Sequence, residues 1–489
     1  MGALVLLCTA LGPARATANA IGVEPKSGPP TSTITADGAA FPSGAFVDIY
    51  FDTQDRCLVR AGRDGSFNCR FSVPGSAKPG YHWISAVVRG TAIGGQTRFN
   101  VNTNWVQFGF SAKHNGYNPY ENVIDVANVG SLGVAWVNHT GVDFRSSPAV
   151  VNGVLYVGSL FDYALDAYSA GDGHRIWRRS LSGAAFSSPA VAKGVVYIGA
   201  YGQQSNDLPG TIYAFRARDG KLLWSRKTGG GIYSSPTVAD GVVFFGSLDR
   251  YLYALRASDG SLVWKVRTAG RVYSSPAVAN GMVYVGSTDY SFYAYSQATG
   301  ALVWQFRTGN EINYASPAVY GGNVYFASAD GKLYACNALT GVRQWDFATA
   351  GVVTASPVVA DSTVYIGSRD NSIYALNAFD GAKKWQFRTG GFVQSTAALL
   401  NQLVLVGSDD GNLYALGNTN GALLWKQNLG GPVVSSPAVT NGVVFDGAYG
   451  GDLVAFRPDL GTRSLTSEQR PELVDLTPDY TLAATGWRR

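Results

Sequence analysis

Residues 275–307, SPAVANGMVYVGSTDYSFYAYSQATGALVWQFR, decide the fold of this 489-residue chain. Asn280-Gly281 separates two runs rich in Val and Tyr, Asp289 begins a second turn, and Thr299-Gly300 makes a third turn before the strand that holds Trp304. Side chains alternate in polarity with period two, and Asx-Gly and Thr-Gly pairs are typical of tight turns between strands. The stretch therefore predicts four short β-strands.

The same pattern recurs along most of the chain. Eight of the 11 tryptophans lie 40, 41 or 47 residues apart, at Trp136, Trp177, Trp224, Trp264, Trp304, Trp345, Trp385 and Trp425. A Ser-Pro column begins at Ser147, Ser188, Ser235, Ser275, Ser316, Ser356 and Ser436, with Ser395-Thr396-Ala397 as its variant. A glycine stands four residues before each of seven tryptophans. Four strands in about 40 residues predict the blades of an all-β propeller.

The arrangement of the first and last units predicts how the ring closes. Eight units begin with the Ser-Pro type of strand, but the eighth ends after Phe456 without a tryptophan strand. Trp136 precedes the first unit and has no unit of its own. We therefore expect an eight-bladed propeller in which the segment around Trp136 completes the last blade, which removes an exposed sheet edge and holds both ends of the ring.

The unit SPAV…VYVGS-x-D…G-x3-W resembles the pyrroloquinoline-quinone (PQQ)-type propeller repeat over residues 130–457. The resemblance implies that each repeat tryptophan packs on a neighbouring blade, a structural docking role. Residues 103–129, with WVQFGFSAKHNGYNPYENV at 105–123, resemble the entry segment of such propellers, expected as a strap across one face or edge of the ring. His114 in this segment is a ligand candidate, although we favour a structural role.

The remaining segments predict further domains. Residues 1–20 have the apolar stretch and the A-x-A-like site of an export signal, and the apolar stretch is too short to span a membrane. Residues 21–102 resemble an immunoglobulin-like (IPT-type) module and predict a small β-sandwich in front of the propeller. Residues 458–489 lose the repeat and predict a poorly ordered tail. We expect a secreted, periplasmic or cell-surface protein without a transmembrane segment.

Cys57 and Cys69 flank the turn signal Gly62-Arg63-Asp64-Gly65. If this turn closes a hairpin, the two thiols lie opposite each other and within reach of a disulfide, which an oxidising compartment favours. The alternative is two free thiols. The hypothesis that we prefer is a disulfide across a hairpin.

A column of candidate binding residues lies two positions before each Ser-Pro serine or its equivalent. Because the first strand of a PQQ-type blade lies nearest the axis, this column is expected at the mouth of the central funnel, where aromatic rings stack planar ligands, sugars or a peptide. The alternative is that the rings only fill space between blades. A polar insertion at 201–209 is a second candidate. The column consists of Arg145, Phe186, Tyr233, Tyr273, Tyr314, Thr354, Gln394 and Val434.

Catalytic signatures are missing from the sequence. PQQ-dependent dehydrogenases carry an adjacent Cys-Cys pair and long insertions that hold calcium ligands and a base, whereas this chain has no Cys-Cys pair and nearly uniform repeats. Four widely spaced histidines give no zinc motif. The aspartates that follow Gly-Ser or Ala-Ser begin hairpin turns. We therefore predict no catalytic residues, no cofactor and no metal site.

These observations favour an exported, non-catalytic interaction scaffold that binds a protein or cell-envelope ligand through its face or funnel. The net charge of +5 is too weak to indicate nucleic acid, and we expect a monomer. One alternative is a PQQ-dependent quinoprotein oxidoreductase, so enzymatic activity stays open. Another resembles the BamB-type outer-membrane assembly factors, although the lipoprotein box of those proteins is missing here.

Overall fold

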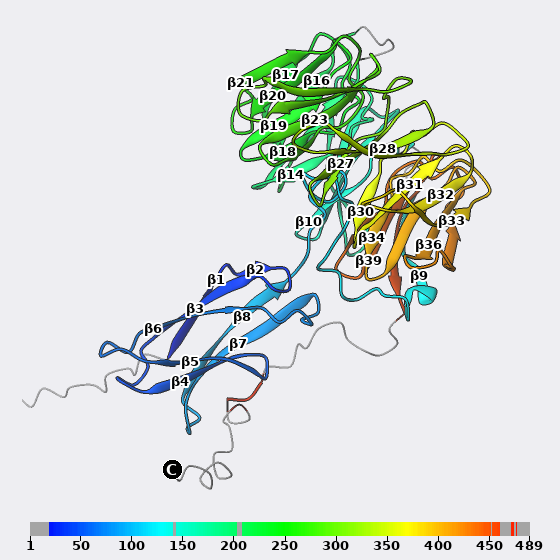
Figure 1. Ribbon diagram of the computed structural model, residues 1–489. Coiled ribbons are helices and arrows are strands. Elements are labelled where there is room, and N and C mark those ends of the chain that lie inside the picture. The colour runs from blue at the N-terminus through cyan, green and yellow to red at the C-terminus, as the bar shows by residue number, and fades with distance from the viewer. Residues whose placement is uncertain are drawn as a thin grey trace, which may run out of the picture. The chain divides into compact units, whose positions relative to one another are not determined.

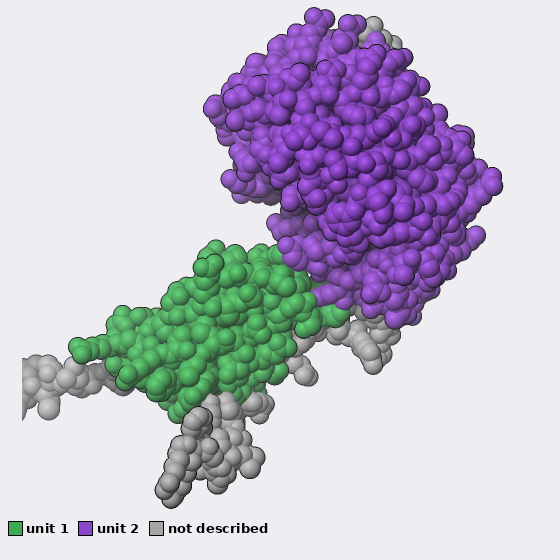
Figure 2. Space-filling model, viewed as in Figure 1, with its two compact units in different colours: residues 1–102, 462–489 green, residues 103–461 purple. Residues whose placement is uncertain are grey.

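The computed structural model describes residues 19–139, 143–202, 208–450, 452–459, 471–473 and 476 (Figure 1). Figure 2 shows two compact units, one of residues 1–102 and 462–489 and the other of residues 103–461. Within the described ranges, the only helical element is the short 3₁₀ turn η1 (Val129–Ser131), and the rest of the regular structure is strand. The chain is therefore all-β. Most of the expected export signal, residues 1–18, lies outside the described residues.

The first unit has two sheets around one core. A three-stranded sheet has the order β1 (Ala20–Glu24), β3 (Thr33–Ala39), β6 (Phe67–Ser72), and a five-stranded sheet has the order β2 (Ser27–Gly28), β8 (Gly94–Val101), β7 (Gly80–Val88), β4 (Phe46–Phe51), β5 (Gln54–Arg60). Only the β2–β8 pair is parallel. Alternate residues of both sheets, such as Ile34, Phe71, Val47 and Phe99, are buried in one shared cluster, as the period-two alternation of strands requires.

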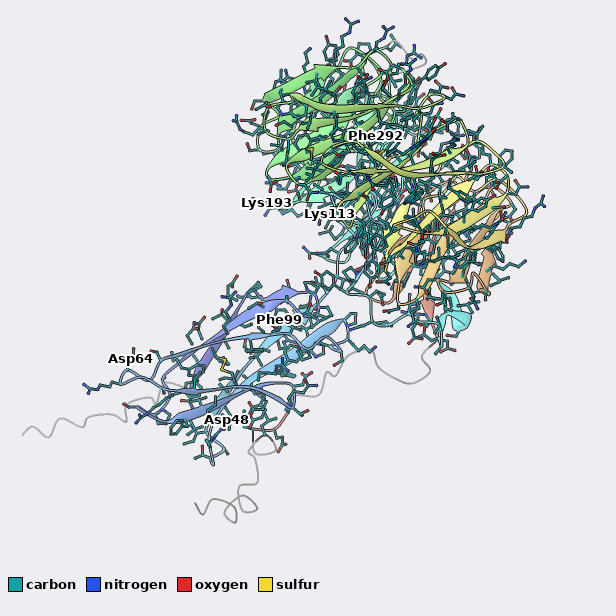
Figure 3. The ribbon with its side chains drawn as sticks, viewed as in Figure 1. Asp48, Asp64, Phe99, Lys113, Lys193 and Phe292 are labelled. Atoms are coloured by element: carbon teal, nitrogen blue, oxygen red, sulfur yellow. A yellow bond between two sulfur atoms is a disulfide. The ribbon has the colours of Figure 1, made fainter. Side chains whose placement is uncertain are left out.

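Cys57 and Cys69 form a disulfide with an S–S distance of 2.06 Å, drawn in yellow in Figure 3. The hairpin expected between them is wrong, because β5 belongs to the five-stranded sheet and β6 to the three-stranded sheet. The turn at Gly62–Gly65 is present, with the Gly65 N–H donating to the Gly62 carbonyl at 3.0 Å. It carries the chain from one sheet to the other, so the disulfide joins the two sheets.

Part of the C-terminal segment, expected to lack order, packs on the first unit. Leu476 is buried against Tyr50 and Val87, and the Gln96 side-chain amide donates to the Pro471 carbonyl at 2.7 Å. Apolar burial by Leu476 and this hydrogen bond explain why these residues have a defined place. The other residues between 460 and 489 lie outside the described part.

The second unit repeats one antiparallel four-stranded sheet, whose strands follow chain order. The first four sheets consist of β10 (Ala149–Val151), β11 (Val154–Ser159), β12 (Ala164–Ser169) and β13 (Arg175–Ser180); β14 (Ala190–Ala192), β15 (Val195–Ala200), β16 (Thr211–Arg216) and β17 (Leu222–Lys227); β18 (Thr237–Ala239), β19 (Val242–Gly246), β20 (Tyr251–Arg256) and β21 (Leu262–Arg267); and β22 (Ala277–Ala279), β23 (Met282–Ser287), β24 (Ser291–Ser296) and β25 (Leu302–Arg307).

The next three sheets have the same order, and a fourth ends with a strand from ahead of the first sheet. They consist of β26 (Ala318–Tyr320), β27 (Asn323–Ala327), β28 (Lys332–Asn337) and β29 (Arg343–Ala348); β30 (Val358–Ala360), β31 (Thr363–Ser368), β32 (Ser372–Asn377) and β33 (Lys383–Arg388); β34 (Ala398–Leu400), β35 (Leu403–Gly407), β36 (Asn412–Gly417) and β37 (Leu423–Asn428); and β38 (Ala438–Thr440), β39 (Val443–Gly447), β40 (Asp452–Pro458) and β9 (Leu132–His139).

The first strands of successive sheets contact one another, and β38 of the last sheet contacts β10 of the first. This cycle of inner-strand contacts, with each sheet extending outward from it, is the arrangement of a β-propeller. In the last sheet β9 pairs with β40 and places Trp136 opposite Ala455. Every other repeat tryptophan also stands opposite an alanine, as Trp304 does with Ala294. Trp136 thus occupies the same register position as the other seven.

Each repeat tryptophan bridges two neighbouring sheets. Its indole N–H donates to a backbone carbonyl of the next sheet at 2.8–3.1 Å, from Trp136 to Ala170, Trp177 to Ala217, Trp224 to Ala257, Trp264 to Gln297, Trp304 to Ala338, Trp345 to Ala378, Trp385 to Asn418 and Trp425 to Leu132. The glycine column explains the fit, because a Cβ on Gly300 would lie 2.8 Å from the Trp264 ring. Gly300 also has φ +73°, a conformation that favours glycine.

Candidate functional site

The eight residues of the predicted mouth column line one cavity of about 190 Å³ on the inner side of the ring. Each stands just before the first strand of its sheet, so the topology that gathers β10, β14 and their equivalents also gathers these side chains. We call this cavity the axial funnel. Its eighteen lining residues are Phe108, Arg145, Ser147, Phe186, Ser188, Tyr233, Ser235, Tyr273, Ser275, Tyr314, Ser316, Thr354, Ser356, Arg369, Gln394, Thr396, Val434 and Ser436.

Below the mouth, the hydroxyl groups of the Ser-Pro column form a closed ring of hydrogen bonds. The backbone N–H of each member donates to the hydroxyl of the member in the next sheet, and Ser436 donates to Ser147 at 3.0 Å. The other distances are 2.9–3.4 Å along Ser147, Ser188, Ser235, Ser275, Ser316, Ser356, Thr396 and Ser436. This hydroxyl ring explains why small hydroxyl residues recur at the position.

The entry segment follows the inner strands around the far side of the hydroxyl ring. Backbone carbonyls of Val106, Ala112, Lys113, Asn115 and Gly116 accept N–H groups from Val191, Val278, Val319, Val359 and Leu399, respectively. Each of those N–H groups lies three residues beyond the ring hydroxyl of its own sheet, whereas the mouth column lies two residues before it. The segment therefore lies opposite the mouth, and its Phe108 side chain forms the floor of the funnel.

His114 of the entry segment has a structural place rather than one in the funnel. Its Nε2 lies 2.9 Å from the Thr237 hydroxyl, and its ring meets Phe108 edge to face at 5.4 Å. Burial lowers the pKa of His114 to about 3. The imidazole is therefore neutral at physiological pH.

Aromatic rings occupy the half of the mouth that belongs to the second through fifth sheets. Phe186 stacks on Tyr233 with ring centroids 4.5 Å apart and planes 19° apart, while Tyr314 lies 5.1 Å from Tyr233 and 5.4 Å from Tyr273. The rings thus pack on one another and also line the cavity. Tyr314 keeps 42% of its surface exposed. Burial raises the pKa of Tyr233 to about 12, so its hydroxyl stays a neutral hydrogen-bond donor.

Polar side chains occupy the opposite half. Arg369 Nη2–H donates to Gln394 Oε1 at 2.8 Å, and Gln394 Nε2–H donates to Asp409 Oδ2 at 2.6 Å. Burial raises the pKa of Asp409, although the Gln394 hydrogen bond and the positive charges of Arg369 and Arg145 act in the opposite direction. The three residues form a fixed hydrogen-bonded chain on the funnel wall.

Arg145 lies between the two halves. Its guanidinium is 6.0 Å from the Phe186 ring centroid and 5.2 Å from that of Tyr449. Among the described residues no carboxylate makes an ion pair with it. Cation–π contacts at these distances orient the guanidinium without neutralising its charge.

Sequence reasoning missed several residues of this site. Arg369, Asp409 and Tyr449 lie one or two residues after the second strand of their sheets, at the start of the middle hairpin. These positions recur in every repeat and so form a second column, but the type of residue that occupies the column changes from sheet to sheet. Phe108 lies in a segment without repeats. Residues 203–207 of the predicted polar insertion lie outside the described part.

The aspartates of the repeat turns fix backbone rather than facing the funnel. Asp289 Oδ1 accepts the Ser291 N–H at 3.0 Å, and its Oδ2 accepts the Ala269 N–H and the Tyr293 hydroxyl, both at 2.8 Å. Asp249, Asp330, Asp370 and Asp410 accept equivalent bonds through Oδ2. Each carboxylate thus ties its hairpin to the end of the preceding sheet.

The donor set of the funnel does not fit a calcium-bound quinone. None of its eighteen lining side chains is a carboxylate, and the nearby Asp409 already accepts from Gln394. In the described ranges no three His, Cys, Asp or Glu side chains converge as metal ligands. Protein sites for hard cations such as Ca²⁺ are built largely from carboxylate and carbonyl oxygens, and the funnel lining offers no carboxylate.

The sequence family is shown by a match to a model described as "Outer membrane protein assembly factor BamB". The match extends over residues 123–208, 208–351, 315–402 and 371–486, more than half of the chain. The chain belongs to this family. The membership confirms the PQQ-type propeller repeat. No curated protein is significantly similar to the chain in sequence.

Solved structures of the same fold include members with different chemistry. BamB from Moraxella catarrhalis has a TM-score of 0.58 and 18% identity, over 67% of this chain and 99% of that one. A europium-containing methanol dehydrogenase has a TM-score of 0.63 and 14% identity, over 72% and 98%. A quinohemoprotein alcohol dehydrogenase from Comamonas testosteroni has a TM-score of 0.62 and 15% identity, over 75% and 82%. At these identities the likeness shows the fold alone.

Proposed function

We propose that this BamB-family chain is an exported, non-catalytic binding scaffold whose axial funnel holds a protein or cell-envelope ligand. The observation that carries the proposal is the convergence of the mouth column from all eight sheets above a floor formed by Phe108. A concave site with several hydrogen-bonding groups and rings on a rigid frame is typical of ligand recognition.

The proposal includes the organisation of the whole chain. Residues 1–20 are an export signal, 21–102 an immunoglobulin-like sandwich that serves as spacer or attachment module, 103–129 the entry segment, 130–457 an eight-bladed propeller and 458–489 a C-terminal tail. The eight four-stranded sheets support the blade count, and the two sheets around one core support the sandwich. Among the described residues, no helix is long and apolar enough to cross a bilayer. We place the chain in the periplasm, at the cell surface or outside the cell.

The chemistry of the funnel supports binding rather than catalysis. Its hydroxyls accept backbone N–H groups, and its tyrosine hydroxyls, where burial raises the pKa, stay protonated near neutral pH. Such groups orient a ligand but supply neither a base nor a metal-polarised electrophile. The family description refers to assembly of outer-membrane proteins and is consistent with a partner from the envelope.

Affinity capture from envelope extract tests the proposal. The full chain is compared with a variant in which Tyr233, Tyr273 and Tyr314 are changed to Ala, and with Phe379→Ala, which removes a 58%-exposed ring outside the funnel. We expect the triple variant to lose the captured ligand and Phe379→Ala to keep it. Unchanged capture by the triple variant contradicts the funnel proposal.

A second assay addresses the quinoprotein alternative. Purified chain is incubated with PQQ and Ca²⁺, and dye reduction is followed with alcohols and sugars. Because the funnel lining lacks carboxylates, we expect no turnover above that of free PQQ. Turnover that depends on the chain would defeat the scaffold hypothesis.

A further inference from the structure

The wall of the axial funnel is rich in hydroxyl groups. Of its eighteen lining residues, seven are serine, two are threonine and five are aromatic, and Val434 is the single aliphatic one. A wall of this kind suits a ligand that carries many hydroxyl groups of its own. It does not suit an apolar peptide anchor, which would leave these hydroxyls without water or partners.

The O–H groups of the hydroxyl ring can donate hydrogen bonds to a ligand. Each ring hydroxyl accepts a backbone N–H, as Ser275 Oγ does from Ser235 and Ser316 Oγ does from Ser275. Within the described part of the chain, none of these hydroxyls donates to a protein acceptor in turn. Thr354 Oγ1, higher on the wall, has no hydrogen-bond partner among the described residues. A hydroxyl is both donor and acceptor, so these O–H groups are available to ligand oxygens.

The aromatic half offers ring faces to such a ligand. Tyr273 and Tyr314 meet edge to face at 5.4 Å, and Tyr314 is substantially exposed. The face of an aromatic ring carries negative charge density and attracts the slightly positive C–H groups on one side of a pyranose ring. Sugar rings thereby gain apolar contact while their hydroxyls reach polar groups.

Two guanidinium groups at the mouth favour a negatively charged ligand. Among the described residues, Arg145 and Arg369 form no ion pair with a carboxylate. Arg369 donates to Gln394, while Arg145 lies over Phe186 and Tyr449. The acidic groups nearby, Asp409 and Glu311, are held by Gln394 and Asn313. Guanidinium forks match planar carboxylates in both shape and charge.

We propose that the axial funnel binds an acidic saccharide, a uronic-acid-containing oligosaccharide. The sugar C–H face packs on Tyr273 and Tyr314, its hydroxyls reach the hydroxyl ring and Thr354, and its carboxylate pairs with Arg145 or Arg369. The inference rests on the proposed function, since it specifies the ligand of that same site. A neutral sugar would leave both guanidiniums without a charged partner.

Isothermal titration calorimetry of the purified full chain tests this assignment, with trigalacturonate as the acidic probe and maltotriose as a neutral trisaccharide. We expect trigalacturonate to bind about tenfold or more tightly than maltotriose, because a charge-assisted pair adds to the shared sugar contacts. Raising the NaCl concentration should weaken binding of the acidic probe more than that of the neutral one.

Matched variants separate the two contributions. Arg145→Gln and Arg369→Gln should reduce the preference for trigalacturonate, and Tyr273→Ala should weaken both probes. Arg388→Gln, which removes the same charge from the exposed end of β33, should change neither, and circular dichroism verifies folding of every variant.

The outcomes distinguish this inference from the function on which it rests. Equal affinity for both sugars, no binding of either, or retained preference in the double Arg145→Gln, Arg369→Gln variant overturns the saccharide assignment. AMP serves as a further probe. If AMP binds and neither sugar does, the saccharide assignment is overturned as well. If envelope capture still depends on the three tyrosines in that case, the scaffold function stands with a different ligand. If capture does not depend on the three tyrosines either, both the saccharide assignment and the funnel proposal are wrong.

Discussion

The backbone N–H of Ser436 donates to the hydroxyl of Ser147 at 3.0 Å, across 289 residues of sequence. The same bond joins Ser235 to Ser275 at 2.9 Å within consecutive repeats. The junction between the last and first sheets is therefore hydrogen-bonded in the same way as the other junctions. On the outer side, the Trp136 indole N–H donates to the Ala170 carbonyl across the same junction, as Trp425 does to Leu132 across the junction before it. The protein closes its ring by repetition rather than by a special contact.

This equivalence predicts equal costs for two substitutions. Ser147→Ala leaves the Ser436 N–H without its acceptor, and Ser275→Ala does the same to Ser235. Loss of a partner for a largely buried N–H costs about 1–3 kcal/mol, so both variants should lower the free energy of unfolding by similar amounts. Chemical denaturation measures both. A neutral Ser147→Ala beside a destabilising Ser275→Ala would mean that the last and first sheets are not joined as described.

The glycines that contact the repeat indoles can be tested with a matched pair of glycine-to-alanine variants, one at an indole contact and one away from it. Gly281 and Gly300 have nearly the same φ, +72° and +73°, so alanine is strained at both by about 1–2 kcal/mol. A Cβ on Gly281 meets nothing within 4 Å, whereas one on Gly300 lies 2.8 Å from the Trp264 ring. Gly300→Ala should therefore cost about 1–3 kcal/mol more than Gly281→Ala in thermal or chemical denaturation. Equal costs would show that Trp264 moves aside freely.

Much of the propeller was predictable because its determinants repeat. Trp304 with Gly300, and Ser275 with the mouth residue Tyr273, each belong to a column with one period, and a period is visible without any structure. The same logic led to the position of Trp136, since a ring cannot leave one strand unmatched. Repetition thus located both the docking residues and the eight residues of the mouth column.

Features that depend on unique contacts were not predictable. Phe108 reaches the funnel because its segment bonds to the inner strands, and nothing in its local sequence indicates that path. The turn at Gly62–Gly65 is correctly a turn, but turn chemistry does not specify whether the chain returns to the same sheet. The hairpin inferred for Cys57 and Cys69 failed for this reason.

In the first unit, the contacts of His82 predict that folding stability depends on pH. Burial lowers its pKa, but Nδ1 lies 2.7 Å from Asp52 Oδ2 and Nε2 lies 2.7 Å from the Lys78 carbonyl, and these acceptors raise the pKa above its usual value overall. Its stabilising contribution should be complete below pH about 6.5 and lost as pH rises through the folded-state pKa. NMR titration of the imidazole C–H signals should show a raised midpoint that Asp52→Asn lowers. A midpoint insensitive to that change would contradict the role of Asp52.

In the last propeller sheet, replacing Asp446 is expected to stabilise the protein. The carboxyl group is fully buried where other sheets carry Val285 or Val406, and Oδ2 has no hydrogen-bond partner among the described residues. Burial raises the pKa of Asp446 to about 7, although hydrogen bonds from Ser435 and the Gly447 N–H oppose the shift.

Because the folded state holds the Asp446 proton more tightly than the unfolded state, stability should fall as pH rises from about 4 to about 7. Asp446→Val should therefore raise the free energy of unfolding at pH 8 by about 1–3 kcal/mol and by less at pH 5, since it removes a buried polar group that is costliest when charged. Asp446→Asn keeps the shape without the charge and should flatten the same pH dependence. Chemical denaturation at both pH values decides between this account and one in which Ser435 makes the carboxylate a net stabilising group, for which Asp446→Val would be destabilising throughout.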